Sequence, residues 1–140
     1  MSTKSRLSRL FSPKSVAVVG GGVWCRSVIE QLIKIGYKGT IFPVHPFKEE
    51  ILGIKSFKDL EDIPTIIDAT FIGVNRNITI EVVKQLNSLN AGGAVCFASG
   101  FLEAEGDKQG SGELQKSLID AAGDMPILGP NCYGFINYLD

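Results

Sequence analysis

The sequence lacks the charge imbalance and the long apolar segments that mark nucleic-acid-binding and membrane proteins. Its 14 basic and 15 acidic residues nearly cancel, to a net charge of −1, whereas proteins that bind nucleic acid or anionic membranes carry a basic excess. No apolar run approaches the roughly 18 residues that cross a bilayer. No apolar signal-peptide core follows the basic segment Met1–Arg9. We therefore expect a cytoplasmic protein with no nucleic-acid or membrane partner.

Cysteine and histidine are too few, and too poorly spaced, to indicate a disulfide framework or a metal site. The three cysteines include no CxxC pair, and the single histidine, His45, has no metal-ligand spacing with them. His45 also lacks a carboxylate at a spacing typical of acid–base catalysis, so we favour a ligand-lining or structural role for it. Cys96 lies in an apolar run and Cys132 in an expected ligand loop. Cys25 falls at an expected helix N-terminus, which would stabilise its thiolate.

Short apolar, β-branched runs alternate along the chain with longer stretches of helical spacing. The apolar runs are typical of strands buried on both faces of a parallel sheet, and they cover 16–19, 41–44, 66–74, 94–98 and 127–128. Pro43 indicates that the second run forms an edge or irregular strand. Helices are expected within 28–33, 78–89 and 113–122, with a short helical turn at 57–63 and a polar loop at 106–112. This alternation predicts a single α/β domain: a Rossmann-like, doubly wound, mainly parallel sheet with helices on both faces.

Glycine is the residue in marked excess. It makes up 16 of 140 residues, about 11 % against a usual value of about 7 %, and without a collagen-like period the excess indicates turns or close approach to a ligand. Gly20–Gly22 follow the first expected strand, at the end where doubly wound sheets bind their ligands. Without Cβ atoms, this turn lets the backbone approach a phosphate that the N–H groups of the next helix attract.

The glycine turn departs from the known nucleotide motifs. The third glycine of a dinucleotide fingerprint would fall at Cys25, and His45-Pro46 replace the acidic residue expected after the second strand. Both departures disfavour an NAD(P)-dependent dehydrogenase. A P-loop is excluded because no Lys-Ser or Lys-Thr follows the glycines at the required spacing.

Four sequence motifs, taken in order, resemble a known family. They are VAVVGGG (16–22), FPVHP (42–46), ASGFLE (98–103) and GPNCYGFIN (129–137). Their order closely resembles the CoA-binding, N-terminal domain of NDP-forming acyl-CoA synthetases, a group similar to the α subunit of succinyl-CoA synthetase. The resemblance implies that residues 1–140 form a CoA-binding domain, part of a larger synthetase, which presents the CoA thiol to an acyl phosphate made elsewhere. It also implies a ligase domain with a phosphorylated histidine and an ATP-grasp domain that uses ATP or GTP with Mg.

The same resemblance assigns the ends of the first two strands to the nucleotide part of CoA. Gly20–Gly22 and the helix start at Trp24–Arg26 match the turn that takes the phosphates. Val44–Pro46 match the segment beside the nucleotide, and Lys48 is the nearest cation. Trp24 has a second interpretation, packing against the sheet, which we favour slightly over stacking on adenine.

The later strand ends are assigned to the phosphates and the pantetheine arm. Val74–Arg76 match a segment that usually reads Val-Pro-Ala, and Asn75-Arg76 would add phosphate contacts. Ser99–Phe101 match the loop beside the pantetheine arm and thiol, while Glu103 either caps this turn or contacts the ligand. No catalytic residue is expected in this domain. The expected CoA-binding residues are Gly20, Gly21, Gly22, Trp24, Arg26, Val44, His45, Pro46, Lys48, Val74, Asn75, Arg76, Ser99, Gly100, Phe101 and Asn131.

Two other functions stay open at this point. One is a stand-alone module that senses CoA or another nucleotide, and the other, disfavoured above, is an NAD(P)-binding oxidoreductase domain. The sequence does not indicate the acyl substrate, the choice between ADP and GDP, or whether the chain forms a homo-oligomer.

Overall fold

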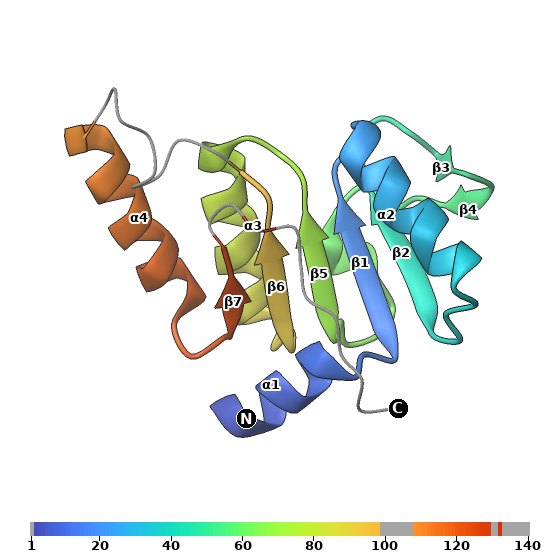
Figure 1. Cartoon of the computed structure of the whole chain (residues 1–140), viewed down its shortest axis with the longest axis horizontal. Coiled ribbons are helices and arrows are strands. Elements are labelled where there is room, and N and C mark those ends of the chain that lie inside the picture. The colour runs from blue at the N-terminus through green and yellow to red at the C-terminus, as the bar shows by residue number, and fades with distance from the viewer. Residues whose placement is uncertain (1, 99–107, 130–131, 133–140) are drawn as a thin grey trace.

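Helices and strands alternate along the chain (Figure 1), and the computed structural model describes residues 2–98, 108–129 and 132. The elements are α1 (Thr3–Phe11), β1 (Ser15–Val19), α2 (Val23–Lys34), β2 (Thr40–Val44), β3 (Glu50–Ile51), β4 (Ile54–Lys55), the 3₁₀ helix η1 (Leu60–Asp62), β5 (Ala69–Ile72), α3 (Arg76–Ser88), β6 (Gly93–Cys96), α4 (Lys108–Ala122) and β7 (Ile127–Leu128).

The main sheet confirms the predicted fold class. Its strand order is β2-β1-β5-β6-β7, and every neighbouring pair is parallel. All residues of β1 and β6 are buried, as strands covered on both faces require. Pro43 lies in β2 at the edge of this sheet, where a missing backbone N–H is tolerated, so the prediction of an edge strand is confirmed.

Helices cover the two faces of the sheet unequally. One face packs against α3 and α4 through a large apolar cluster that includes Val83, Leu86 and Leu118. The other face carries α2, whose Ile29 and Cys25 are buried in a smaller cluster with β1 and β5. Figure 1 shows α2 in front of the sheet and α3 behind it. Because all main strands point the same way, their carboxyl ends share one edge, and the loops beyond them can form a single site.

Three local features differ from the sequence-based expectations. The predicted polar loop at 106–112 is wrong in its described part, because α4 already begins at Lys108. The glycines in its first turns each cost about 1 kcal/mol, and burial of Leu118 and Ala122 further along α4 offsets that cost. The helix α1 and the β3–β4 hairpin were not predicted, whereas η1 confirms the short helical turn expected within 57–63.

Two arginines fasten α1 across the amino ends of β5 and β6. Arg6 is 5 % exposed. Its guanidinium donates to the Ala91 carbonyl at 2.9 Å, to Asn87 Oδ1 at 2.9 Å and to the Asn87 carbonyl at 3.2 Å. Arg9 pairs with Asp68 at 2.7 Å. Burial lowers the pKa of Arg6, and these acceptors replace the water that the buried guanidinium has lost.

Replacing Arg6 should destabilise the fold far more than replacing its exposed neighbour on α1. Arg6→Ala removes the donors of three hydrogen bonds, so we expect the free energy of unfolding to fall by about 2–4 kcal/mol. Lys4→Ala, at an exposed position of the same helix, should change it by less than about 0.5 kcal/mol. Urea denaturation of both variants measures the difference, and equal midpoints would show that α1 is not fastened through Arg6.

Candidate functional site

A cavity of about 370 Å³ opens at the carboxyl edge of the sheet. Its walls come from the ends of β1 and β2, from the segment before and within η1, and from the loop after β5 with the first turns of α3. Most of the wall is apolar, with a few polar groups at its rim, as is common in sites for small molecules. The lining residues are Val19, Gly20, Gly21, Val44, His45, Pro46, Lys58, Asp59, Leu60, Val74, Ile78, Val82 and Gln85.

The glycine turn brings backbone N–H groups to the mouth of this cavity. Gly20 has φ +125°, and a Cβ there would lie 2.6 Å from the Gly73 carbonyl oxygen, so only glycine fits. Gly22 is the N-cap of α2 and makes no side-chain capping bond. A Cβ built at Gly22 would have no described residue within 4 Å. The first N–H groups of α2 therefore face a position that a ligand can approach closely, and the helix dipole favours an anion there.

His45 and Lys48 shape the side of the turn that faces β2. Nδ1 of His45 accepts hydrogen bonds from the N–H groups of Phe47 and Lys48, both at 3.1 Å, which assigns the ring proton of neutral His45 to Nε2. The imidazole edge faces Gly21, where a Cβ would lie 2.7 Å from Nε2. Lys48 Nζ donates to the Gly21 carbonyl at 3.1 Å. His45 thus lines the cavity and also closes its own loop, and both Lys48 and the helix N-terminus are placed to attract phosphate.

The structure brings six of the predicted binding residues together on the cavity wall. These are Gly20, Gly21, Val44, His45, Pro46 and Val74. Gly22 and Lys48 lie at the turn itself. Four further predicted residues, Ser99, Gly100, Phe101 and Asn131, lie outside the described part of the chain.

Four predicted residues lie away from the cavity wall. Arg26 projects from the exposed side of α2, with its Nε 3.5 Å from Glu30. Asn75 caps α3, where its Oδ1 accepts from the Ile78 N–H at 2.9 Å, and Arg76 follows it as the first residue of α3. Trp24 packs against Phe97, with ring centroids 5.2 Å apart, which supports the packing role over stacking on adenine. Their assignment to CoA remains a prediction.

The far wall of the cavity consists of residues that the sequence did not single out. Lys58, Asp59 and Leu60 come from the segment at η1, and Ile78 and Gln85 come from α3. Among these residues, the sequence could have pointed only to Ile78, an apolar residue in the first turn of its helix. The structure shows its side chain 47 % exposed at the cavity. No motif links η1 to α3, so only the fold reveals that they meet.

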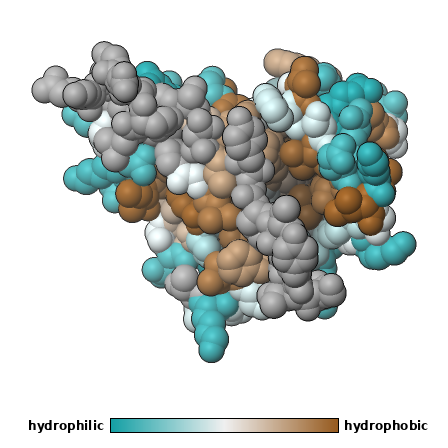
Figure 2. Space-filling view, in the orientation of Figure 1, coloured by the Kyte–Doolittle hydropathy of each residue, from teal (hydrophilic) through white to brown (hydrophobic). Residues whose placement is uncertain are grey.

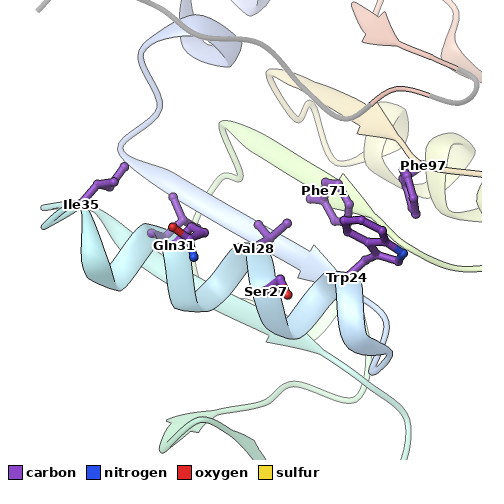
Figure 3. A pocket seen from close by; sticks show the side chains of 8 residues that line it. Trp24, Ser27, Val28, Gln31, Ile35, Phe71 and Phe97 are labelled. Atoms are coloured by element: carbon purple, nitrogen blue, oxygen red, sulfur yellow. The ribbon is translucent and has the colours of Figure 1, made fainter.

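A second, more apolar groove runs along α2 on the opposite face of the sheet. Its volume is about 360 Å³, and Trp24, Val28, Phe71 and Phe97 line it together with Ser27, Gln31, Leu32 and Ile35 (Figure 3). Seen from this face, apolar side chains also gather over the middle of the molecule (Figure 2). The groove holds no charged side chain among the described residues that line it, so it is unsuited to a phosphate.

Cys25 lies beneath the glycine turn as a buried thiol. It is 1 % exposed, and its Sγ donates to the Val19 carbonyl at 3.4 Å and to the Gly73 carbonyl at 3.7 Å. Burial raises the pKa of this thiol. The expectation that the helix N-terminus stabilises a thiolate at Cys25 is therefore wrong, because loss of solvation outweighs the helix dipole. Cys96 is buried as predicted, and burial raises its pKa to about 12.

A parallel sheet with a glycine turn, a helix N-terminus and a cavity at its carboxyl edge defines a Rossmann-like nucleotide-binding domain. The model of the CoA-binding domain family matches residues 14–138. The chain therefore belongs to the CoA-binding domain family, and the resemblance seen in the sequence is confirmed. Within the described residues, we find no helix long and apolar enough to cross a membrane and no cluster of three metal-ligating side chains.

Relatives with curated functions are much longer ligases. The chain is 33 % identical to a trans-feruloyl-CoA synthase from an unknown prokaryotic organism, over 99 % of this chain and 20 % of the synthase. It is 36 % identical to the ADP-forming acetate–CoA ligase II of Archaeoglobus fulgidus, over 94 % of this chain and 20 % of the ligase. The chain thus spans about a fifth of the length of these relatives and is homologous to a CoA-binding region of ADP-forming acyl-CoA ligases.

Solved structures show the same fold in a long chain and in a short one. The apo form of a dinucleotide-forming acetyl-coenzyme A synthetase 1 from Ca. Korarchaeum cryptofilum matches with a TM-score of 0.82 and 30 % identity, over 91 % of this chain and 28 % of that chain. A Thermus thermophilus structure matches with a TM-score of 0.63 and 19 % identity, over 94 % of this chain and 93 % of that chain. The second likeness shows the fold alone.

The burial of Cys25 predicts slow alkylation in the folded protein. A raised pKa leaves little thiolate at pH 8, and the low exposure blocks the reagent, so iodoacetamide should modify Cys25 about 100-fold more slowly than in urea. Peptide mass spectrometry over time resolves Cys25 from the half-buried Cys132, which serves as the internal comparison. Rapid labelling of Cys25 in the folded chain would show that the glycine turn opens readily.

Proposed function

We propose that this chain binds coenzyme A across the carboxyl edge of its sheet and presents the CoA thiol within an NDP-forming acyl-CoA synthetase. The observation that carries the proposal is the junction of the glycine turn with the cavity. An anion-attracting helix N-terminus, with Lys48 beside it, opens directly onto a mainly apolar wall. A pyrophosphate joined to an adenosine matches this arrangement, because its anionic phosphates stand next to a flat base with apolar ring faces.

The cavity suits the nucleotide part of CoA in size and in lining. Its volume of about 370 Å³ lies within the range of about 300–1,000 Å³ that is usual for small-molecule sites. We place the pyrophosphate at the N–H groups of the turn and the adenine between Pro46 and Ile78, whose apolar surfaces can cover its ring faces. Lys48 and Lys58 supply positive charge for the pyrophosphate and the ribose 3′-phosphate.

The remaining predicted contacts extend this proposal along the ligand. Trp24, Arg26, Asn75 and Arg76 lie away from the cavity wall, so the contacts proposed for them are with parts of CoA outside the cavity. By resemblance, we assign the pantetheine arm and thiol to 99–101 and Asn131.

In the proposed enzyme, residues 1–140 are the CoA-holding domain and the chemistry takes place with the help of other domains. An acyl phosphate is attacked by the CoA sulfur, which forms the thioester bond while phosphate leaves. A ligase domain with a phosphorylated histidine and an ATP-grasp domain, using ATP or GTP with Mg, supply the acyl phosphate. The relatives support this assignment because they are ligases of which this chain matches about a fifth.

A stand-alone CoA or nucleotide sensor is the second candidate. It requires the nucleotide site described above and no chemistry from another domain. An NAD(P)-binding oxidoreductase domain is weaker, because the position of the third fingerprint glycine holds Cys25, whose thiol packs against the ends of β1 and β5.

Titration calorimetry of the purified chain tests the ligand. We expect CoA to bind in the micromolar range, dephospho-CoA to bind several-fold more weakly for want of one phosphate, and NAD and ATP to bind more weakly than CoA. Binding of NAD with no binding of CoA would contradict the proposal and favour the oxidoreductase alternative.

The glycine turn itself is tested most cleanly at Gly22. Its backbone (φ −78°, ψ 178°) accepts any residue, and no described atom crowds a Cβ there. Gly22→Val should lower CoA affinity at least about tenfold, because a branched side chain blocks the approach of phosphate to the backbone, while the free energy of unfolding changes by less than about 1 kcal/mol. Calorimetry and urea denaturation give both quantities.

Gly21→Val is the comparison variant. A Cβ at Gly21 would lie 2.5 Å from His45 Cδ2, so the imidazole must move aside before the variant can fold. We expect it to fold and to lose affinity as well. Unchanged CoA affinity in Gly22→Val would mean that the turn has only a structural role.

A further inference from the structure

We propose that Asp59 and Gln85 make the cavity selective for adenine over bases that carry an oxygen at position 6. This inference rests on the proposed function, in which the base of CoA occupies the cavity. It assigns a specificity-determining role to two residues that neither the sequence motifs nor the glycine turn include.

The two side chains meet on the cavity wall. Gln85 lies on α3 and Asp59 immediately precedes η1, and both line the cavity. Gln85 Nε2 donates a hydrogen bond to Asp59 Oδ1. The same carboxylate oxygen accepts the N–H of Glu61 at 3.0 Å, because Asp59 is the N-cap of η1. Both hydrogen bonds are exposed to solvent, and together they orient the Asp59 side chain and, through it, the Gln85 carboxamide.

The chemistry of this contact determines which atom Gln85 can offer a ligand. An ionised carboxylate only accepts hydrogen bonds, so the NH₂ of the carboxamide must face Asp59. The carbonyl oxygen Oε1 is then the part of Gln85 that remains to meet a base. Without Asp59, the carboxamide could rotate by half a turn and present either group.

An acceptor in this place discriminates between purines. Adenine carries an amino donor at position 6, whereas guanine and hypoxanthine carry a carbonyl acceptor there. Oε1 can accept from the amino group but would face the carbonyl oxygen without a shared proton, so the analogue loses one hydrogen bond that adenine makes.

The test compares CoA with its deaminated analogue, in which hypoxanthine replaces adenine and the rest of the ligand is unchanged. We expect the original chain to bind CoA about tenfold more tightly than the analogue, as measured by calorimetry. Asp59→Ala removes the one oxygen that both caps η1 and accepts from Gln85. The Gln85 carboxamide then becomes free to rotate and present either group, so the preference should fall below about twofold.

Two further variants separate base selection from general damage to the site. Gln85→Leu removes the acceptor Oε1 and should also abolish the preference for CoA over the analogue, with CoA still bound. Glu61→Gln changes an exposed side chain next to the pair whose described contact with Asp59 is through its backbone N–H, so it should keep the tenfold preference. Thermal unfolding of each variant establishes that it is folded.

The possible results distinguish this inference from the proposed function. If the original chain binds neither ligand, the CoA assignment fails and the base selection with it. If it binds CoA and the analogue equally, or if Asp59→Ala keeps the tenfold preference, CoA binding stands and the role of Asp59 and Gln85 is refuted.

Discussion

The close approach of two strand ends, those of β1 and β5, is the constraint on which the site depends. The Gly73 N–H donates to the Val19 carbonyl at 2.9 Å, and the Cys25 thiol lies across both strand ends. A Cβ at Gly73 would lie 2.5 Å from Cys25 Sγ, and one at Gly20 would lie 2.8 Å from it. Neither position can carry a side chain while the thiol is in place. This packing sets where α2 begins, and so where its N–H groups point.

The position of the helix start then determines what kind of ligand the sheet edge can hold. The turn itself supplies backbone donors and a dipole but no selectivity, because its N–H groups bind the phosphate of any ligand in the same way. Selectivity must come from the walls beside it. Those walls are built on the larger apolar cluster between the sheet and α3, in which Val44, Leu60 and Val82 are buried. On this packed wall, the proposed pair of Asp59 and Gln85 would present one hydrogen-bonding pattern to the base.

The backbone half of the site could be predicted from the sequence, and the side-chain half could not. Gly20–Gly22 and Val44–Pro46 follow their strands directly, so the period of the apolar runs is enough to bring them to one edge. Asp59 and Gln85 stand 26 positions apart in segments without a motif, and only tertiary packing joins them. Arg26 and Asn75 follow strand ends in the sequence, but an ion pair with Glu30 and a helix cap determine where their side chains point. Helix α1 escaped prediction because a buried arginine, Arg6, rather than an apolar stripe fastens much of it.

The two residues of this domain with the most reactive side chains near the site are both engaged within the fold. The one histidine, His45, has its Nδ1 engaged by two backbone N–H groups, and Cys25 is a buried thiol, so neither is suited to carry a phosphoryl or acyl group. In the proposed enzyme, the domain contributes by anchoring the nucleotide end of CoA at a distance from the thiol. Binding energy from this remote part of the ligand offsets the entropy that the thiol loses on meeting an acyl phosphate. Under this proposal, selective recognition of adenine would serve thioester formation even though the base takes no part in the reaction.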